Sequence, residues 1–109
     1  MTDRAADHFT SRRSNCAQAV ALAWKEKKDP GFPNVDRFAK HGGGRAPEGL
    51  CGALHAAREL AGAQKDQLTE QFKTLADGHI TCRDIRRNRV MPCIDCVATA
   101  AELLEETSR

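Results

Sequence analysis

Tyrosine is absent from this chain of 109 residues, and large apolar side chains of every kind are scarce. Of its 44 apolar residues 17 are alanine, whereas valine and isoleucine together number only seven. Side chains that branch at Cβ, such as valine and isoleucine, favour strands, whereas alanine and leucine favour helices. This composition therefore excludes an all-β sandwich and predicts an all-α fold. A domain of this length buries roughly two thirds of its unfolded surface, so we expect a thin core.

Long apolar runs are also lacking, since none approaches the roughly 18 residues that a membrane span needs. The first residues lack the apolar stretch of a secretory signal, so we expect a cytoplasmic protein without a membrane partner. The formal net charge is only +2, which gives no reason to expect nucleic acid as a partner. Because no repeat or low-complexity linker interrupts the chain, residues 1–109 are predicted to form a single helical domain.

Helical periodicity and capping signals predict a small bundle of about five to seven short helices. In the clearest of these, small and apolar side chains share one face, and Ser14 or Asn15 can cap the helix. Thr81 and Asp84 fit a capping box that begins a short helix, and Pro92 suits the first turn of the last helix. The predicted helices span residues 3–9, 15–27 (the clearest one), 35–40, 50–61 and 65–76, followed by the short helix after Thr81 and the last helix, which continues to about residue 106.

Cysteine, in contrast, is abundant, and the chain contains Cys16, Cys51, Cys82, Cys93 and Cys96. An odd number of cysteines without an export signal favours metal-binding or catalytic thiols in a reducing compartment over a disulfide framework. All except Cys96 are predicted to lie in or next to the first turn of a helix. The partial positive charge of a helix N-terminus lowers the pKa of a thiol there, and the resulting thiolate attacks disulfides and binds metals.

The segment Cys93-Ile94-Asp95-Cys96 has the CxxC spacing of a dithiol pair or of half a metal site. In the dithiol interpretation Cys93 attacks and Cys96 or Cys82 resolves, which makes Cys93 and Cys96 the candidate catalytic residues. The alternative is two small side chains packed against the core. A second CxxC for a zinc ribbon is missing, and no predicted strand precedes the motif as in a thioredoxin-like fold.

Histidine and arginine side chains near the cysteines are further candidates. His55 follows Cys51 by four positions, which on a helix gives a spacing suited to a metal; the alternative is a histidine at the edge of the core. A basic cluster beside Cys82 predicts thiolate activation, or docking of an anionic substrate or acidic redox partner; the alternative is a solvated helix face. The cluster consists of Arg83, Arg86, Arg87 and Arg89.

Three blocks of the sequence together resemble a known family over about residues 11–106. The blocks are residues 14–20, the glycine run 42–44 followed by residues 51–56 (CGALHA), and residues 82–104, which contain Cys82 and Cys93. In this order they resemble the C_GCAxxG_C_C family of redox-active proteins, whose central motif reads CGAxxG. This chain departs from the motif at Ala56, where the second glycine is expected, and it carries Cys96 as an additional ligand or resolving thiol.

The resemblance implies a helical, redox-active domain with four functional cysteines, Cys16, Cys51, Cys82 and Cys93. It implies that they hold an iron–sulfur cluster or another metal centre for electron transfer or redox sensing, because four thiolates are the usual ligands of such clusters and of zinc. Two alternatives stay open: a metal-free dithiol protein centred on Cys93 and Cys96, and a non-catalytic helical interaction module. We expect an unidentified redox protein as partner, and a homodimer as a candidate assembly that would bury more of this lightly apolar chain.

Overall fold

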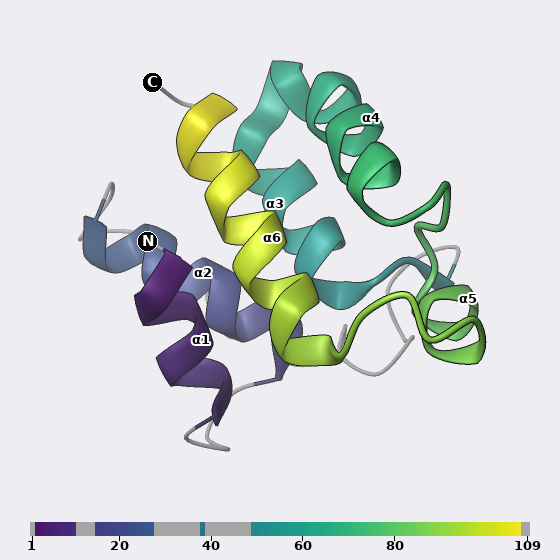
Figure 1. Cartoon of the computed structure of the whole chain (residues 1–109). Helices are drawn as coiled ribbons and strands as arrows, with labels where there is room; N and C mark the ends of the chain where they lie inside the picture. The colour runs from purple at the N-terminus through teal and green to yellow at the C-terminus, as the bar shows by residue number, and fades with distance from the viewer. Residues whose placement is uncertain (1, 11–14, 28–37, 39–48, 108–109) are drawn as a thin grey trace.

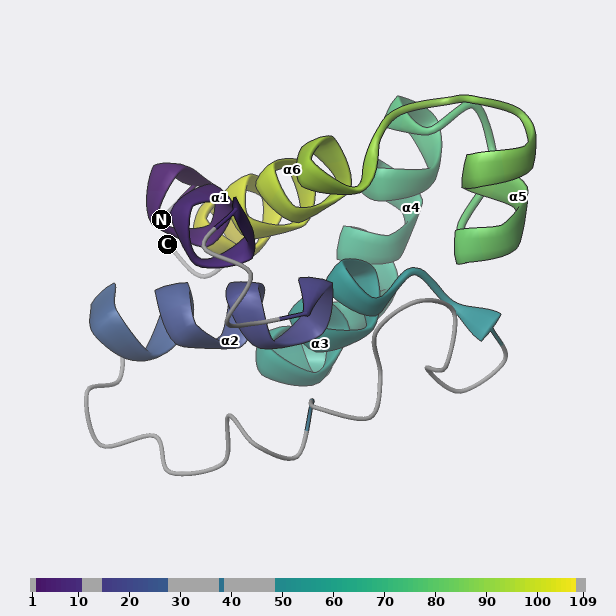
Figure 2. The ribbon, with the colours of Figure 1, turned by 90° about the horizontal axis from the view of Figure 1, so that it is seen from below.

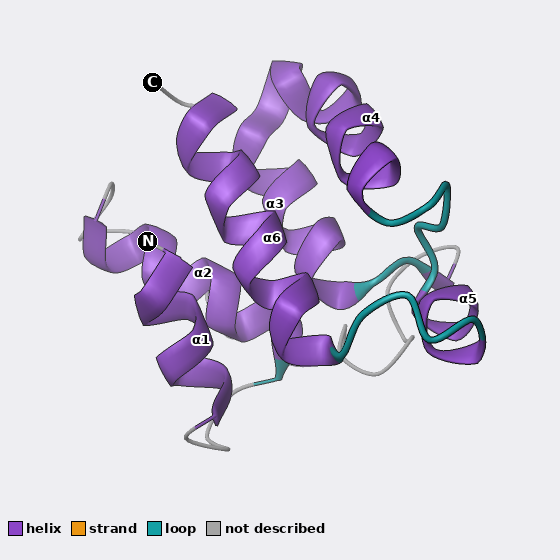
Figure 3. Ribbon diagram, in the orientation of Figure 1, coloured by secondary structure: helices purple, strands orange, loops and turns teal. Residues whose placement is uncertain are grey.

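The computed structural model describes residues 2–10, 15–27, 38 and 49–107. These residues form six α-helices and one 3-10 helix, with no strand among them (Figure 3). The elements are α1 (Thr2–Thr10), α2 (Cys16–Lys27), α3 (Gly52–Ala61), η3 (Gly62–Gln64), α4 (Lys65–Leu75), α5 (Cys82–Arg87) and α6 (Cys93–Thr107). The all-α prediction is therefore confirmed.

The predicted helix boundaries agree with the structure to within a few residues. Asn15 caps α2 through its side chain, and Ser14, the other predicted cap, lies outside the described residues. The predicted helix at 35–40 also lies outside them, apart from the buried Phe38. Capping residues and glycines mark helix ends through local backbone chemistry, which explains why these boundaries follow from the sequence.

The helices pack in two layers with two additions. Figure 2 shows α1 and α6 lying over α2 and α3, and each of these helices packs against several of the others. Helix α4 packs on α3 and α6, whereas α5 stands at one end of the molecule (Figure 1) and buries a single side chain, Ile85. The end that carries α5 is thus built on few apolar contacts.

Small side chains dominate the core, as the composition indicates. Five residues of α2 are buried, and four of them are alanine. The largest fully buried side chains include Phe72 and Leu68 on α4, Leu54 on α3 and Leu104 on α6. Because alanine protrudes little from a helix, the helix backbones in this core can approach closely.

Polar contacts at the surface join the same helices. Arg4 Nη2 donates to Glu26 Oε2 at 2.9 Å, and Lys27 Nζ donates to Glu105 Oε2 at 2.9 Å. Exposed ion pairs of this kind stabilise a fold little, so the buried apolar contacts hold the helices together. Among the helices of the described residues, none has the length and apolar character needed to cross a bilayer.

Candidate functional site

All five cysteines line one cavity of about 110 Å³. Cys16, Cys82 and Cys93 are the first residues of α2, α5 and α6, and Cys51 is the N-cap of α3. The prediction that four cysteines stand at helix starts is confirmed. The fifth, Cys96, lies in the first turn of α6. Four helix starts from distant parts of the chain therefore bring their thiols to one place.

Capping side chains fix two of these helix starts. Asn15 Oδ1 accepts a hydrogen bond from the Gln18 N–H at 2.8 Å, and Gln18 Oε1 accepts one from the Asn15 N–H at 3.1 Å. Thr81 Oγ1 accepts a hydrogen bond from the Asp84 N–H at 3.2 Å. Each cap directly precedes the cysteine that begins its helix, so the capping signal in the sequence also positions the thiol.

Backbone contacts hold the start of α3 against the start of α5. The Cys51 N–H donates to the Ile80 carbonyl at 2.9 Å, and Leu50 forms an antiparallel bridge with Thr81. Cys51 and Cys82 consequently face the same cavity although 31 positions separate them in the sequence.

Cys51 and Cys96 form a buried sulfur pair. The two residues are only 5% and 4% exposed, and both line the cysteine cavity. The hydrogen bond from Cys96, helped by the backbone N–H groups of Leu54 and Ala53, lowers the pKa of Cys51 to about 7. The same hydrogen bond, together with burial, raises the pKa of Cys96. Cys96 thus keeps its proton while Cys51 ionises.

This arrangement predicts a thiolate near neutral pH. Because the pKa of Cys51 is lowered in the folded protein, its ionised form stabilises the fold at high pH, and that stabilisation is lost as the pH falls through about 7. We expect the ultraviolet thiolate absorbance of the reduced, metal-free protein to rise with a midpoint near pH 7. Cys51→Ser should remove this rise and Cys82→Ser should keep it. Thiolate absorbance that appears only above about pH 8.5, as for a free thiol, would contradict the sulfur pair.

Arg86 connects the outer cysteines. Its Nη2 donates a hydrogen bond to the Cys93 sulfur at 3.4 Å. That hydrogen bond and the charge of Cys93 raise the pKa of the guanidinium, and Cys82 and Cys16 add to the effect. Arg86 is therefore a fixed positive charge at the mouth of the thiol cavity.

The prediction that a helix start lowers the thiol pKa is wrong for Cys82. Burial raises the pKa of Cys82, and the opposing charge of Arg86 does not cancel the rise. Helix α5 has only six residues, so its N-terminus gives little help to a thiolate. The pKa of Cys51 is lowered, mainly by Cys96 and with a smaller contribution from the backbone N–H groups at the start of α3.

The donor chemistry of the cavity suits a thiolate-bound metal, because cysteine thiolates are the ligands of iron–sulfur clusters and of structural zinc. Arg86 would also offset the negative charge of such a centre. The described residues, however, nowhere bring three or more cysteine, histidine or acidic side chains into positions that could hold a metal ion together. A four-thiolate centre therefore requires the helix starts to approach one another more closely.

His55 is separated from this site. Its side chain is buried, and its ring meets Phe38 edge-on with the ring centroids 6.1 Å apart. It is not among the described residues that line the cysteine cavity. The structure therefore places His55 in the core, which agrees with the alternative prediction of a core-edge histidine and not with a metal ligand. Ala56, at the motif's glycine position, is also fully buried in α3.

Some features of the site could not be predicted from the sequence. Phe9, Ile85 and Met91 form apolar walls of the cavity, and none of them carries a local signal for this role. The burial of Cys96 did have a signal, because Cys96 begins the stripe of buried positions along α6. That stripe comprises Cys96, Val97, Ala100, Ala101, Leu103 and Leu104.

Comparison with known proteins identifies a family. The family model described as "Putative redox-active protein (C_GCAxxG_C_C)" matches residues 14–107. No curated protein and no solved structure matches this chain. The matched residues include all five cysteines and every helix from α2 to α6.

Proposed function

Because this chain belongs to the C_GCAxxG_C_C family of redox-active proteins, we propose that its cysteine cavity is a dithiol redox site. In this site Cys51 and Cys96 cycle between two thiols and one disulfide. The observation that carries the proposal is the burial of Cys51 and Cys96 in one cavity, where Cys96 lowers the pKa of Cys51. A thiolate beside a protonated thiol is the arrangement from which thiol–disulfide exchange proceeds.

The chemistry needs an external disulfide as oxidant. A thiolate of the protein attacks one sulfur of that disulfide, forms a mixed disulfide and releases the other half as a thiolate. The second protein thiol then displaces the remaining half. The protein loses two electrons and two protons, and the external disulfide becomes two thiols. In a reducing compartment such as the cytoplasm, we expect the dithiol form to be the resting state.

A metal or iron–sulfur centre held by Cys16, Cys51, Cys82 and Cys93 is the second candidate. The observation in its favour is that all four thiols line the same cavity, next to the positive charge of Arg86. Such a centre would supply electron transfer or redox sensing, with Cys96 as an additional thiol. A dithiol made of Cys93 and Cys96 is the third arrangement, supported by their CxxC spacing on α6.

The first experiment combines a visible spectrum, metal analysis and thiol counting on anaerobically purified protein. We expect a colourless, metal-free protein with five free thiols, which loses two of them on treatment with hydroxyethyl disulfide. Peptide mapping should then find Cys51 joined to Cys96. Stoichiometric iron with visible absorption bands, or stoichiometric zinc, would instead support the metal centre. Cys93 joined to Cys96 as the final product would support the third arrangement.

A further inference from the structure

We propose that the groove beside Cys93 binds small disulfides that carry carboxylates and presents them to the Cys93 sulfur. The inference rests on the dithiol function and names its substrate class. The groove has a volume of about 430 Å³, within the range of roughly 300 to 1,000 Å³ that small-molecule sites occupy. It is lined by Arg86, Arg89, Val90, Met91, Pro92 and Cys93.

Cys93 links this groove to the buried sulfur pair. It lines both the groove and the cysteine cavity, and it is less buried than Cys51 and Cys96. A molecule seated in the groove would therefore meet Cys93 before it meets the other two thiols. Arg86 also lines both spaces and donates its hydrogen bond to the Cys93 sulfur.

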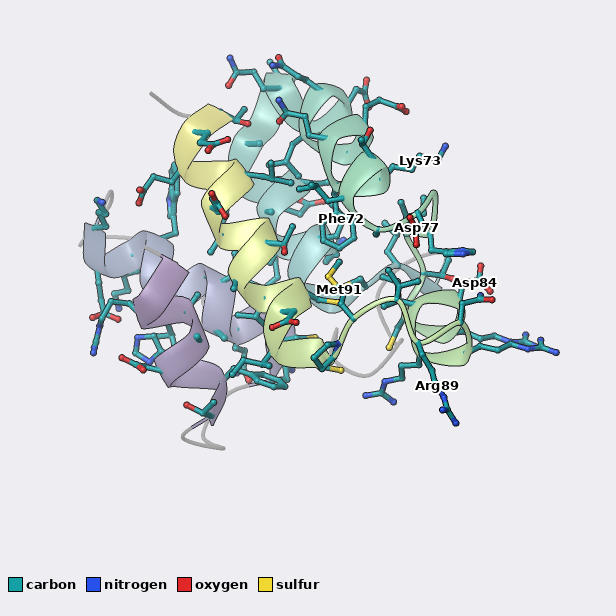
Figure 4. All side chains as sticks on the ribbon, viewed as in Figure 1. Phe72, Lys73, Asp77, Asp84, Arg89 and Met91 are labelled. Carbon is teal, nitrogen blue, oxygen red and sulfur yellow. The ribbon has the colours of Figure 1, made fainter. Side chains whose placement is uncertain are left out.

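The charge of the groove is positive. Arg86 and Arg89 are both exposed, and no acidic side chain stands among the described residues that line the groove. Arg89 extends outward from the segment after α5 (Figure 4), and no carboxylate of the described chain forms an ion pair with it. Guanidinium groups bind carboxylates through paired, charge-assisted hydrogen bonds, so this groove favours an anionic ligand.

The backbone at Arg89 supports a role for its side chain. Arg89 has a φ of 52°, in the left-handed region, directly after the C-cap of α5. The Val90 N–H donates to the Ile85 carbonyl at 3.1 Å, and the Arg89 N–H donates to the Arg86 carbonyl at 3.2 Å. This is the helix-ending motif in which glycine is the usual left-handed residue. An arginine here has an unfavourable backbone conformation, as residues retained for their side chains often do.

The thiols lie in an order that carries the oxidation from the groove to the buried pair, while two electrons pass outward to the bound disulfide. Cys93 attacks the bound disulfide, forming a mixed disulfide and releasing one half as a thiolate. Cys96 is three positions further along the helix, so the two Cα atoms are about 5 Å apart, within the range for a disulfide. Cys96 displaces the second half, and Cys51 then attacks the Cys96 sulfur and frees Cys93. The products are the Cys51–Cys96 disulfide and two small thiols.

Three small disulfides of different charge test the proposal. Dithiodiglycolate is a dianion, hydroxyethyl disulfide is neutral and cystamine is a dication. The rate of thiol loss is measured for each disulfide with folded protein and with urea-denatured protein. The ratio of the two rates corrects for differences in the chemical reactivity of the disulfides themselves. We expect the folded protein to prefer the dianion over the dication, and Arg89→Gln to reduce that preference by about threefold or more. Arg83→Gln removes an equal charge from α5 outside the groove and should leave the preference unchanged.

Arg89→Gly separates binding from folding. Glycine accepts the left-handed conformation, so this variant should be at least as stable as the wild type in urea denaturation and should still lose the preference. An equal loss in Arg83→Gln and Arg89→Gln would overturn the groove as the cause. A wild type that reacts with hydroxyethyl disulfide but shows no charge preference would overturn this inference alone. If none of the three disulfides oxidises a pair of thiols, the proposed function itself is wrong.

Discussion

Oxidation of Cys51 and Cys96 is expected to raise the free energy of unfolding by about 4 kcal/mol. The two cysteines are 45 positions apart, from 51 to 96, and closing a loop of this length restricts the unfolded chain. Both thiols already line one cavity, and α3 and α6 already pack together, so the disulfide requires little rearrangement of the folded state. Urea denaturation of the oxidised and the reduced protein at one pH measures the difference.

Cys51→Ser provides the control, because its stability should not change on treatment with the same oxidant. Equal stability of the oxidised and reduced wild type would contradict the predicted crosslink. The same free energy should also appear in the reduction potential. A stabilisation of about 4 kcal/mol lowers the potential by about 85 mV relative to the same disulfide in an unfolded chain. Equilibration with a thiol–disulfide buffer, in native and in denaturing conditions, measures this shift.

Local signals explain how much of the fold could be predicted. Asn15, Thr81 and Pro92 each mark the start of a helix, and the structure begins helices there. A cap acts through neighbouring backbone groups, so it can be identified without knowledge of the tertiary structure. The positions of Cys16 and Cys82 at helix starts followed directly from these caps.

Tertiary contacts explain what could not be predicted. The CxxC spacing pointed to Cys93 as the partner of Cys96, whereas in the structure Cys96 is buried in one cavity with Cys51, and the two thiols shift each other's pKa. That contact depends on the packing of α3 against α6, for which no short sequence motif exists. The raised pKa of Cys82 has the same origin, since burial by distant segments exceeds the local effect of its helix start.

The roles of Arg86 and Arg89 were partly visible in the sequence. A basic cluster beside Cys82 indicated an anionic substrate or partner, and it could equally have been a solvated helix face. The structure divides the cluster, because Arg86 and Arg89 line the groove at Cys93, whereas Arg83 and Arg87 are not among its lining residues in the described chain. Which arginines of a cluster share a groove depends on how α5 ends, and the left-handed conformation of Arg89 determines that end.

Replacement of Cys96 by serine is expected to abolish formation of the buried disulfide. Serine keeps a hydrogen-bond donor toward Cys51 and is close to cysteine in size, so the variant should fold. On treatment with hydroxyethyl disulfide, we expect this variant to form no disulfide in the folded core. We also expect its free energy of unfolding to stay unchanged. Thiol titration and urea denaturation provide both measurements.

Cys82→Ser is the matched comparison, because the two candidate functions differ in which cysteine they need. The dithiol site is lost in Cys96→Ser, whereas the metal centre is lost in Cys82→Ser. A dithiol site needs Cys96 and tolerates Cys82→Ser, since Cys82 is not a member of the sulfur pair. A four-thiolate centre needs Cys82, while the additional Cys96 is replaceable. Cys82→Ser should therefore keep the oxidant-induced disulfide and its stabilisation. If Cys82→Ser instead loses bound metal and stability while Cys96→Ser keeps both, the cavity holds a metal centre and the dithiol assignment is wrong.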